Sequence, residues 1–352
     1  DKLTPVILLD KLDRSNRLCV RAHMSIRFTN SARPSGLSRI INTAASQWLA
    51  AYGDEKKIMT VTTRSDIALP GRAGDPDFHL STLQAGEGHA VVFVHGFPDL
   101  AQGWQHQLRA IAELGYHAIA PDMRGYGGSS CPGAVDAYTL DELSGDLVAL
   151  LDALGIEQAT FVGHDWGGFV IWGLAVLHPD RVAGIAAACT PYMPFPSVAV
   201  HTELVGGDIE RQYVAWFQQP GVAEAYMDQR VSPIISKIMR TAPPLEEVYA
   251  AAFADGALNM NPFLGIDTAP TLGEPLLDTE DFEHYVDAFS RTGFRGGINW
   301  YRNIDHNAAV HPDVGVAPLT LPCLMLMADR DPALRPEFAA DMPERCSNLE
   351  MH

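Results

Sequence analysis

Short apolar runs alternate with helical stretches from about residue 78 onward. Runs rich in β-branched and small residues predict buried strands at Ala90–Val94, His117–Ala120, Ala159–Val162, Val182–Cys189 and Leu321–Met327. Amphipathic stretches lie between them. The alternation of strand and helix predicts an α/β fold with a mostly parallel sheet flanked by helices.

One helix is marked at both of its ends. Thr139 and Glu142 have the spacing of a capping box, and Gly155 stands where a helix commonly ends. The leucines between these markers recur at helical spacing: Leu143, Leu147, Leu150, Leu151 and Leu154. The segment is therefore predicted to be a core-facing helix.

Strand signals disappear between about Pro194 and Asp313 and resume near Leu319. Prolines interrupt this stretch, which reads as helices and loops. We predict a helical insertion over one edge of the sheet, following the strand that ends near Cys189. The chain then divides into a first core part, a helical cap and a last core part, at residues 59–193, 194–313 and 314–352.

Residues 1–58 differ in composition from the rest. They hold an excess of basic residues, and an Arg- and Ser-rich stretch without acidic residues runs from Arg14 to Gly53. This resembles an organelle transit peptide. The alternatives are an unstructured extension or sequence upstream of a start at Met24 or Met59. In each case we expect an N-terminal extension that is not part of the fold.

Overall composition narrows the function. Formal net charge is −18, with 25 Lys+Arg against 43 Asp+Glu, which argues against a nucleic-acid partner. No apolar run is long enough for a membrane span. The five cysteines show no CxxC and no zinc-type spacing, so we expect a reducing compartment and no metal.

The strongest chemical signal is Gly163-His164-Asp165-Trp166-Gly167-Gly168, between a predicted strand and an apolar helix. Glycines two before and two and three after Asp165 suit a sharp strand-to-helix turn, where a Cβ would clash. A carboxylate at this point can attack an sp³ carbon and form an ester without a base to activate it. The simpler alternative is an Asp that caps the following helix.

A second motif follows the strand Ala90–Val94. It is His95-Gly96-Phe97-Pro98, and its loop is placed to supply an oxyanion-hole N–H. The backbone N–H groups of Phe97 and Trp166 would then face an ester oxygen on Asp165. Phe97-Pro98 is a candidate cis peptide, and His95 alone is more typical of a packed or turn histidine than of a catalyst.

Asp331 lies in Met327-Ala328-Asp329-Arg330-Asp331, at the end of the last clear strand, where α/β folds display functional residues. We predict that it orients a His, with Asp329 as the competing choice.

Together these motifs and the Asp122–Ser130 loop resemble the epoxide hydrolase branch of the α/β-hydrolase superfamily, over about residues 78–352. Haloalkane dehalogenases share the His-Gly-x-Pro motif and the Asp at the strand-to-helix turn, so these two motifs alone do not identify the substrate. The segments 213–224 and 293–303 resemble the two cap segments that carry the epoxide hydrolase tyrosines, which maps those tyrosines to Tyr213 and Tyr301. Without that resemblance both would read as ordinary amphipathic cap residues, as Tyr285 does.

The family mechanism also needs a His on the loop after the next strand. Residues 348–352 read as the start of that strand, and His352 lies within it, too early to be the base. We expect the catalytic His and the rest of the last strand to lie beyond residue 352.

The resemblance implies that Asp165 attacks an epoxide carbon while Tyr213 and Tyr301 stabilise the oxygen. Water activated by a His paired with Asp331 then releases a diol. It implies a small apolar epoxide and water as substrates, with no cofactor. The alternatives are a haloalkane dehalogenase and a non-catalytic or truncated hydrolase-like binding protein. We expect a cytoplasmic location, with an organelle as the alternative.

Overall fold

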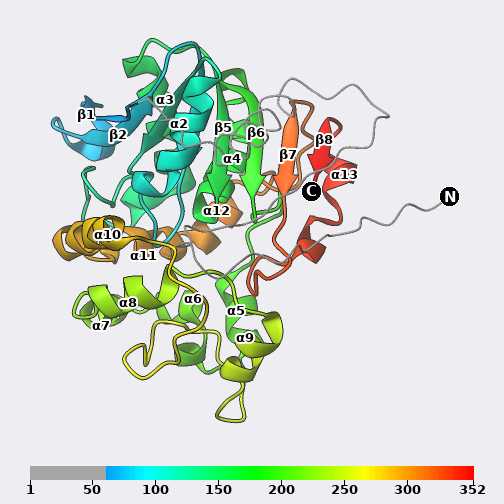
Figure 1. Cartoon of the computed structure of the whole chain (residues 1–352). Helices are drawn as coiled ribbons and strands as arrows, with labels where there is room; N and C mark the ends of the chain where they lie inside the picture. The colour runs from blue at the N-terminus through cyan, green and yellow to red at the C-terminus, as the bar shows by residue number, and fades with distance from the viewer. Residues whose placement is uncertain (1–60) are drawn as a thin grey trace, which may run out of the picture.

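The structure, a computed structural model, describes residues 61–352, so the predicted extension at residues 1–58 lies outside the described residues. One eight-stranded sheet runs in the order β1-β2-β4-β3-β5-β6-β7-β8 (Figure 1). Its strands are β1 (Thr63–Ala68), β2 (His79–Ala85), β3 (His89–Val94), β4 (Tyr116–Pro121), β5 (Ala159–His164), β6 (Val182–Ala188), β7 (Cys323–Leu326) and β8 (Leu349–Met351). β2 pairs antiparallel with β1 and β4, and all other pairs are parallel. The predicted α/β class with a mostly parallel sheet is confirmed.

All five predicted strands are present, with ends that differ by one or two residues. β1 and β2, which form the antiparallel edge, are additional to the predicted strands. β1 is TRSDIA and mostly exposed, while β2 buries the polar Ser81 and Thr82 beside its leucines. Neither strand carries the apolar run that marks a strand buried on both faces, so the pattern gave no signal.

Three long helices cover the faces of the sheet: α2 (Gln105–Glu113), α3 (Leu140–Ala153) and α4 (Trp166–Leu177). α3 is the predicted leucine helix. Thr139 Oγ1 accepts a hydrogen bond from the N–H of Glu142, and Gly155 follows the helix at φ +68°. The Glu142 carboxylate binds Arg72 and Arg124, so only the Thr139 half of the predicted capping box is seen.

A buried ion pair ties α3 to the loop after β4. The Arg124 and Asp146 side chains are fully buried, and the guanidinium donates to both carboxylate oxygens. Arg72 donates to the same carboxylate at 2.9 Å. Removing Asp146 would leave a buried cation without its main partner, which is costlier than the pair itself is stabilising.

We therefore expect Asp146→Ala to lower the free energy of unfolding by about 3–5 kcal/mol. Asp152→Ala is the matched control on the same helix. Its carboxylate is largely exposed and pairs with Arg181, so its loss should cost under about 1 kcal/mol. Urea unfolding of both variants measures the difference, and equal losses would contradict this account.

Only helices and loops occur between β6 and β7, as predicted. The helices are α5 (Val198–Leu204), α6 (Tyr213–Trp216), α7 (Val222–Met227), α8 (Val231–Ile238), α9 (Leu245–Ala252), α10 (Thr279–Thr292), α11 (Arg295–Arg302) and α12 (Ile304–Val310). In Figure 1 most of them lie below the sheet, beyond the ends toward which β5 and β6 point. We call residues 198–310 the helical insertion. It faces the edge of the sheet where Asp165 begins α4.

The chain returns through β7, a short helix α13 (Met342–Arg345) and β8. β8 pairs with β7 in parallel, as expected of residues 348–352, and His352 continues this pairing through its backbone. No helix within residues 61–352 combines the length and apolar character that crossing a membrane requires.

Candidate active site

Asp165 occupies the predicted sharp turn between β5 and α4. Its backbone has φ +54° and ψ −126°, a left-handed conformation that non-glycine residues rarely adopt. The Asp165 carbonyl accepts hydrogen bonds from Thr190 Oγ1 at 2.7 Å and from the Gly168 N–H at 3.0 Å. Backbone strain at this residue is therefore held by its surroundings, as at many catalytic turns.

Two glycines of the turn are required by close packing. A Cβ on Gly163 would lie 2.5 Å from the carbonyl oxygen of Gly167, and a Cβ on Gly167 would lie 2.0 Å from that of Val94. Both obstacles are backbone atoms, which cannot rotate away. The spacing read from the sequence thus has a direct steric cause.

The loop after β3 meets the Asp165 side chain. The Phe97 N–H donates to Asp165 Oδ1 at 2.8 Å, and the Phe97-Pro98 peptide is cis, as predicted. Gly96 permits this approach, because a Cβ there would lie 2.3 Å from Asp165 Oδ1. The Trp166 N–H also hydrogen-bonds the carboxylate. The two backbone donors predicted for an oxyanion hole therefore converge on Asp165.

His95 is a structural residue of this loop. Its buried ring accepts a hydrogen bond from the Met123 N–H at Nε2, at 2.9 Å. Nδ1 must then carry the proton, and it donates to the carbonyl of Gly96 at 2.9 Å. Since both ring nitrogens are occupied within the protein, the geometry favours the packed histidine over a catalyst.

Burial raises the pKa of the Asp165 carboxyl above its ordinary value. The charge of His164 and the N–H groups of Phe97 and Trp166 act in the opposite direction, and the charge of Asp331 adds to the rise. A carboxylate with few stabilising contacts beyond two N–H groups is a better nucleophile than a fully solvated one.

Tyr213 and Tyr301 come together near Asp165 from two segments of the helical insertion. Their rings pack edge to face at 5.6 Å, and their side chains are hydrogen-bonded to each other. Burial raises the pKa of both phenols, and the nearby charge of Asp165 raises it further. Both therefore remain protonated donors at neutral pH.

The insertion fixes these tyrosines by linking α6 to α11. The Gln218 amide donates to the carbonyls of Val214 and Tyr301, at 2.8 and 3.1 Å. Arg302 donates to the carbonyl of Phe217 at 2.8 Å. The two tyrosine-bearing segments thus form one unit, which the tyrosine spacing alone did not reveal.

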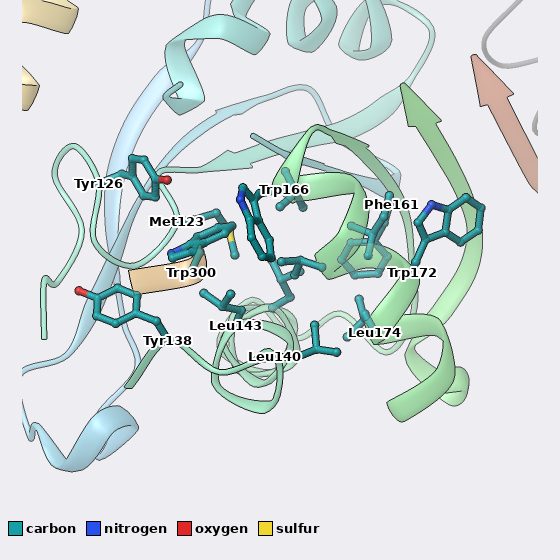
Figure 2. Packing of buried hydrophobic residues seen from close by; sticks show 14 of the residues in the cluster. Met123, Tyr126, Tyr138, Leu140, Leu143, Phe161, Trp166, Trp172, Leu174 and Trp300 are labelled. Atoms are coloured by element: carbon teal, nitrogen blue, oxygen red, sulfur yellow. The ribbon is translucent and has the colours of Figure 1, made fainter. Parts of the chain in front are cut away.

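Aromatic rings of the insertion pack around the residues that hold Asp165. Tyr301 packs edge to face on Trp166 at 5.0 Å and on Phe97 at 5.5 Å, the two residues whose N–H groups hold Asp165. Phe97 also meets Phe217, Phe263 and Phe294. Figure 2 shows Trp166 beside Trp300, with Tyr126 next to them. A site walled by such rings favours an apolar ligand.

Asp331 lies on the loop after β7. One carboxylate oxygen accepts from the N–H groups of Ala333 and Leu334, each at 2.8 Å. Its charge acts on both Asp165 and Tyr213, whereas the competing Asp329 is exposed. The structure thus places Asp331 at the same edge of the sheet as the nucleophile candidate. Its predicted pairing with a His stays a prediction.

Cys189, at the end of β6, is a neighbour that the sequence analysis missed. Its backbone is left-handed, at φ +64°, and its side chain is hydrogen-bonded to Asp331. Burial, together with the charges of Asp331 and Asp165, raises the thiol pKa to about 12. The thiol therefore stays protonated, acts as a donor and does not compete with Asp165 as a nucleophile.

His352 lies next to Glu350, with its Nε2 2.7 Å from the carboxylate. Within residues 61–352, no group of three His, Cys, Asp or Glu side chains has the arrangement of a metal site.

The comparisons with known proteins agree with this geometry. A family model described as alpha/beta hydrolase fold matches residues 89–223. Epoxide hydrolase A of Mycobacterium tuberculosis is 40% identical over 262 residues, 72% of this chain and 80% of that protein. The pig bifunctional epoxide hydrolase 2 is 35% identical over 275 residues. The matched region covers 78% of this chain and 49% of that longer protein.

Solved structures give the same result. The crystal structure of epoxide hydrolase A from Mycobacterium thermoresistibile superposes with a TM-score of 0.71, at 36% identity, over 83% of this chain and 90% of that one. Epoxide hydrolase VrEH1 from Vigna radiata gives 0.67 at 29% identity, over 82% and 88%.

The sheet, the turn at Asp165 and the intervening helices therefore define an α/β-hydrolase fold. Within that fold, the chain belongs to the epoxide hydrolase family.

Proposed function

We propose that the protein hydrolyses a small apolar epoxide to a vicinal diol through a covalent ester on Asp165. The observation that carries the proposal is that two backbone N–H groups hydrogen-bond the Asp165 carboxylate while two protonated phenols lie close enough for its charge to act on them. The family relationship supports the same reaction.

In the first step an Asp165 oxygen attacks an epoxide carbon and the C–O bond of the ring breaks. Negative charge develops on the departing ring oxygen, where Tyr213 and Tyr301 donate hydrogen bonds. One phenol transfers its proton, and the alkoxide becomes a hydroxyl group. The product of this step is a hydroxyalkyl ester of Asp165.

In the second step water attacks the ester carbonyl carbon, and the N–H groups of Phe97 and Trp166 stabilise the oxyanion that forms. A His oriented by Asp331 takes the proton of the water. The ester C–O bond to the carboxyl carbon breaks, and the departing alkoxide takes the proton held by the His, so the diol leaves with an oxygen that came from Asp165. The carboxylic acid that remains returns its proton to the phenolate formed in the first step, which restores both the carboxylate and the phenol.

The experiment treats the protein, with the His that pairs with Asp331 present, with a styrene-type epoxide in H₂¹⁸O. The proposal expects the diol of a single turnover to contain unlabelled oxygen and Asp165 to gain the ¹⁸O. Peptide mass spectrometry of the turn locates the label, and intact mass detects the ester before hydrolysis. Label in the first diol would exclude the ester, and no reaction with any epoxide would overturn the function.

The reaction should lose rate on the acid side at a pH above the ordinary range of an aspartate. Attack requires the ionised carboxylate, and burial raises the pKa of Asp165, so the rate falls as pH drops through that raised value. The alkylation rate from pH 4 to 8 measures this limb. A flat profile down to the usual Asp pKa of about 3.9 would contradict it.

Paired phenols support an epoxide over a haloalkane, whose departing halide needs no proton. Water and the epoxide complete the proposed list of partners, and the acidic charge gives no support for a nucleic acid. A cytoplasmic location is supported by the free thiols of the four described cysteines.

A further inference from the structure

Tyr285 does more than pack in the core, the role expected from its apolar helix face. It lies on α10 of the helical insertion and is 1% exposed. Its hydroxyl donates a hydrogen bond to Asp99 Oδ1, on the loop after β3. A residue of the insertion thus reaches the loop that carries Phe97.

Asp99 closes the turn around Phe97. Its N–H donates to the carbonyl of Gly96 at 3.1 Å, and its Oδ1 also accepts from the N–H of Leu100 at 2.8 Å. The intervening residue, Phe97, donates its N–H to Asp165 at 2.8 Å. Fixing the Asp99 end of this short turn therefore fixes the direction of the Phe97 N–H.

The absence of a side chain at Gly103 leaves space for the hydrogen bond between Tyr285 and Asp99. A Cβ on Gly103 would lie 2.7 Å from Asp99 Oδ1 and 3.1 Å from the Tyr285 hydroxyl. Burial raises the pKa of Tyr285, and the charge of Asp99 raises it further, so the phenol stays protonated and donates. A charge-assisted bond is stronger than a neutral one.

We propose that Tyr285 is a positioning residue, which holds the oxyanion-hole N–H of Phe97 on Asp165 through its hydrogen bond to Asp99. The inference rests on the proposed function, because it assigns Tyr285 a part in that reaction.

The test compares Tyr285→Phe with Asp281→Ala, its matched control on α10. Asp281 also joins α10 to the core, accepting from Gln102 and Gln105 at 2.8 and 2.9 Å, but it does not contact the Phe97 turn. Both variants weaken docking of the helix. Only Tyr285→Phe removes the donor to Asp99.

We expect Tyr285→Phe to slow hydrolysis of the Asp165 ester by about tenfold to a hundredfold, since a displaced donor acts on the transition state. A weaker Phe97 hydrogen bond also raises the Asp165 pKa, so the acid limb of alkylation should move to higher pH. The other titratable groups that act on Asp165 are unchanged in both variants: His164, Asp331, Tyr126, Tyr213, Tyr301 and Cys189. Asp281→Ala should leave the limb and the rates in place.

A readout that needs no turnover separates this inference from the proposed function. Hydrogen exchange at the amides of residues 96–100 should quicken in Tyr285→Phe and in Asp99→Ala, and not in Asp281→Ala. Asp99→Asn keeps an acceptor and should restore most of the protection. Equal exchange and equal pH limbs in the two α10 variants would overturn the inference. Lack of alkylation in the unaltered chain, with the exchange difference present, would overturn only the reaction.

Discussion

Asp165→Ala is expected to abolish both the covalent ester and diol formation. In the proposed reaction the carboxylate supplies the electrons of the new C–O bond, and the neighbouring thiol of Cys189 does not replace it, because that thiol is held protonated. Loss of a nucleophile lowers the rate on the order of 10⁶-fold. Rapid-quench kinetics with a styrene-type epoxide and intact-mass spectrometry measure both steps.

The fold should survive this change. Burial raises the pKa of Asp165, so the folded state disfavours the charged form and loses stability as pH rises through the carboxyl titration. Removing that charge at neutral pH should leave the melting temperature equal or higher, and Asp165→Asn should behave alike. Asp329→Ala, an exposed carboxylate on the loop after β7, is the activity control. Turnover by Asp165→Ala at an ordinary rate would exclude the ester mechanism.

Much of the parallel core could be predicted because each strand there is buried on both faces. Such strands read as mostly apolar runs, as in β3 and the first part of β5, and the glycines around Asp165 mark the turn by simple steric need. The antiparallel edge could not be found this way. β1 is mostly exposed and β2 buries serine and threonine, so hydrophobicity says little about either.

The site was predictable where its chemistry depends on neighbours in the chain. Phe97 and Asp165 each lie directly after a strand, and strand ends of a parallel sheet meet at one edge. The contacts between distant segments were not predictable. Tyr285 and Asp99 are 186 positions apart, and the alternation along α10 marks Tyr285 only as an inward-facing residue. Side-chain hydrogen bonds across such distances leave no periodic trace in one sequence.

The same reasoning explains the tyrosine pair. Residue spacing within α6 or α11 does not show that Tyr213 and Tyr301 meet. The two segments are joined by hydrogen bonds from the side chains of Gln218 and Arg302 to backbone carbonyls, and the spacing of residues along one helix carries no trace of such bonds. The resemblance to the epoxide hydrolase family predicts that Tyr213 and Tyr301 act as a pair, and their edge-to-face ring contact gives this prediction a physical basis. Their roles stay a proposal that mutation can test.

The double change Tyr213→Phe and Tyr301→Phe is expected to nearly abolish alkylation, with each single change slowing it by about 10²- to 10³-fold. The phenols are the proposed donors to the ring oxygen. Phenylalanine at position 301 keeps the ring packing against Trp166 and Phe97 while removing the hydroxyl. With one phenol left, a donor and a proton remain available, so the single variants keep measurable rates. The loss should appear in the alkylation rate constant more than in substrate binding, because the charge on oxygen develops only in the transition state.

Tyr249→Phe is the matched control, since Tyr249 lies exposed on α9 of the same insertion. Tyr249→Phe should be alkylated at the rate of the unaltered chain. The melting temperature of every variant should lie within a few degrees of that of the unaltered chain. The double variant also decides between the two chemistries that share this turn at Asp165. A haloalkane loses its halide without a proton, so halide release from short chloroalkanes by the double variant, with no epoxide reaction in the unaltered chain, would favour a dehalogenase. Loss of alkylation confined to the tyrosine variants ties the phenols to the epoxide oxygen, because only that leaving group must be protonated as the ring opens.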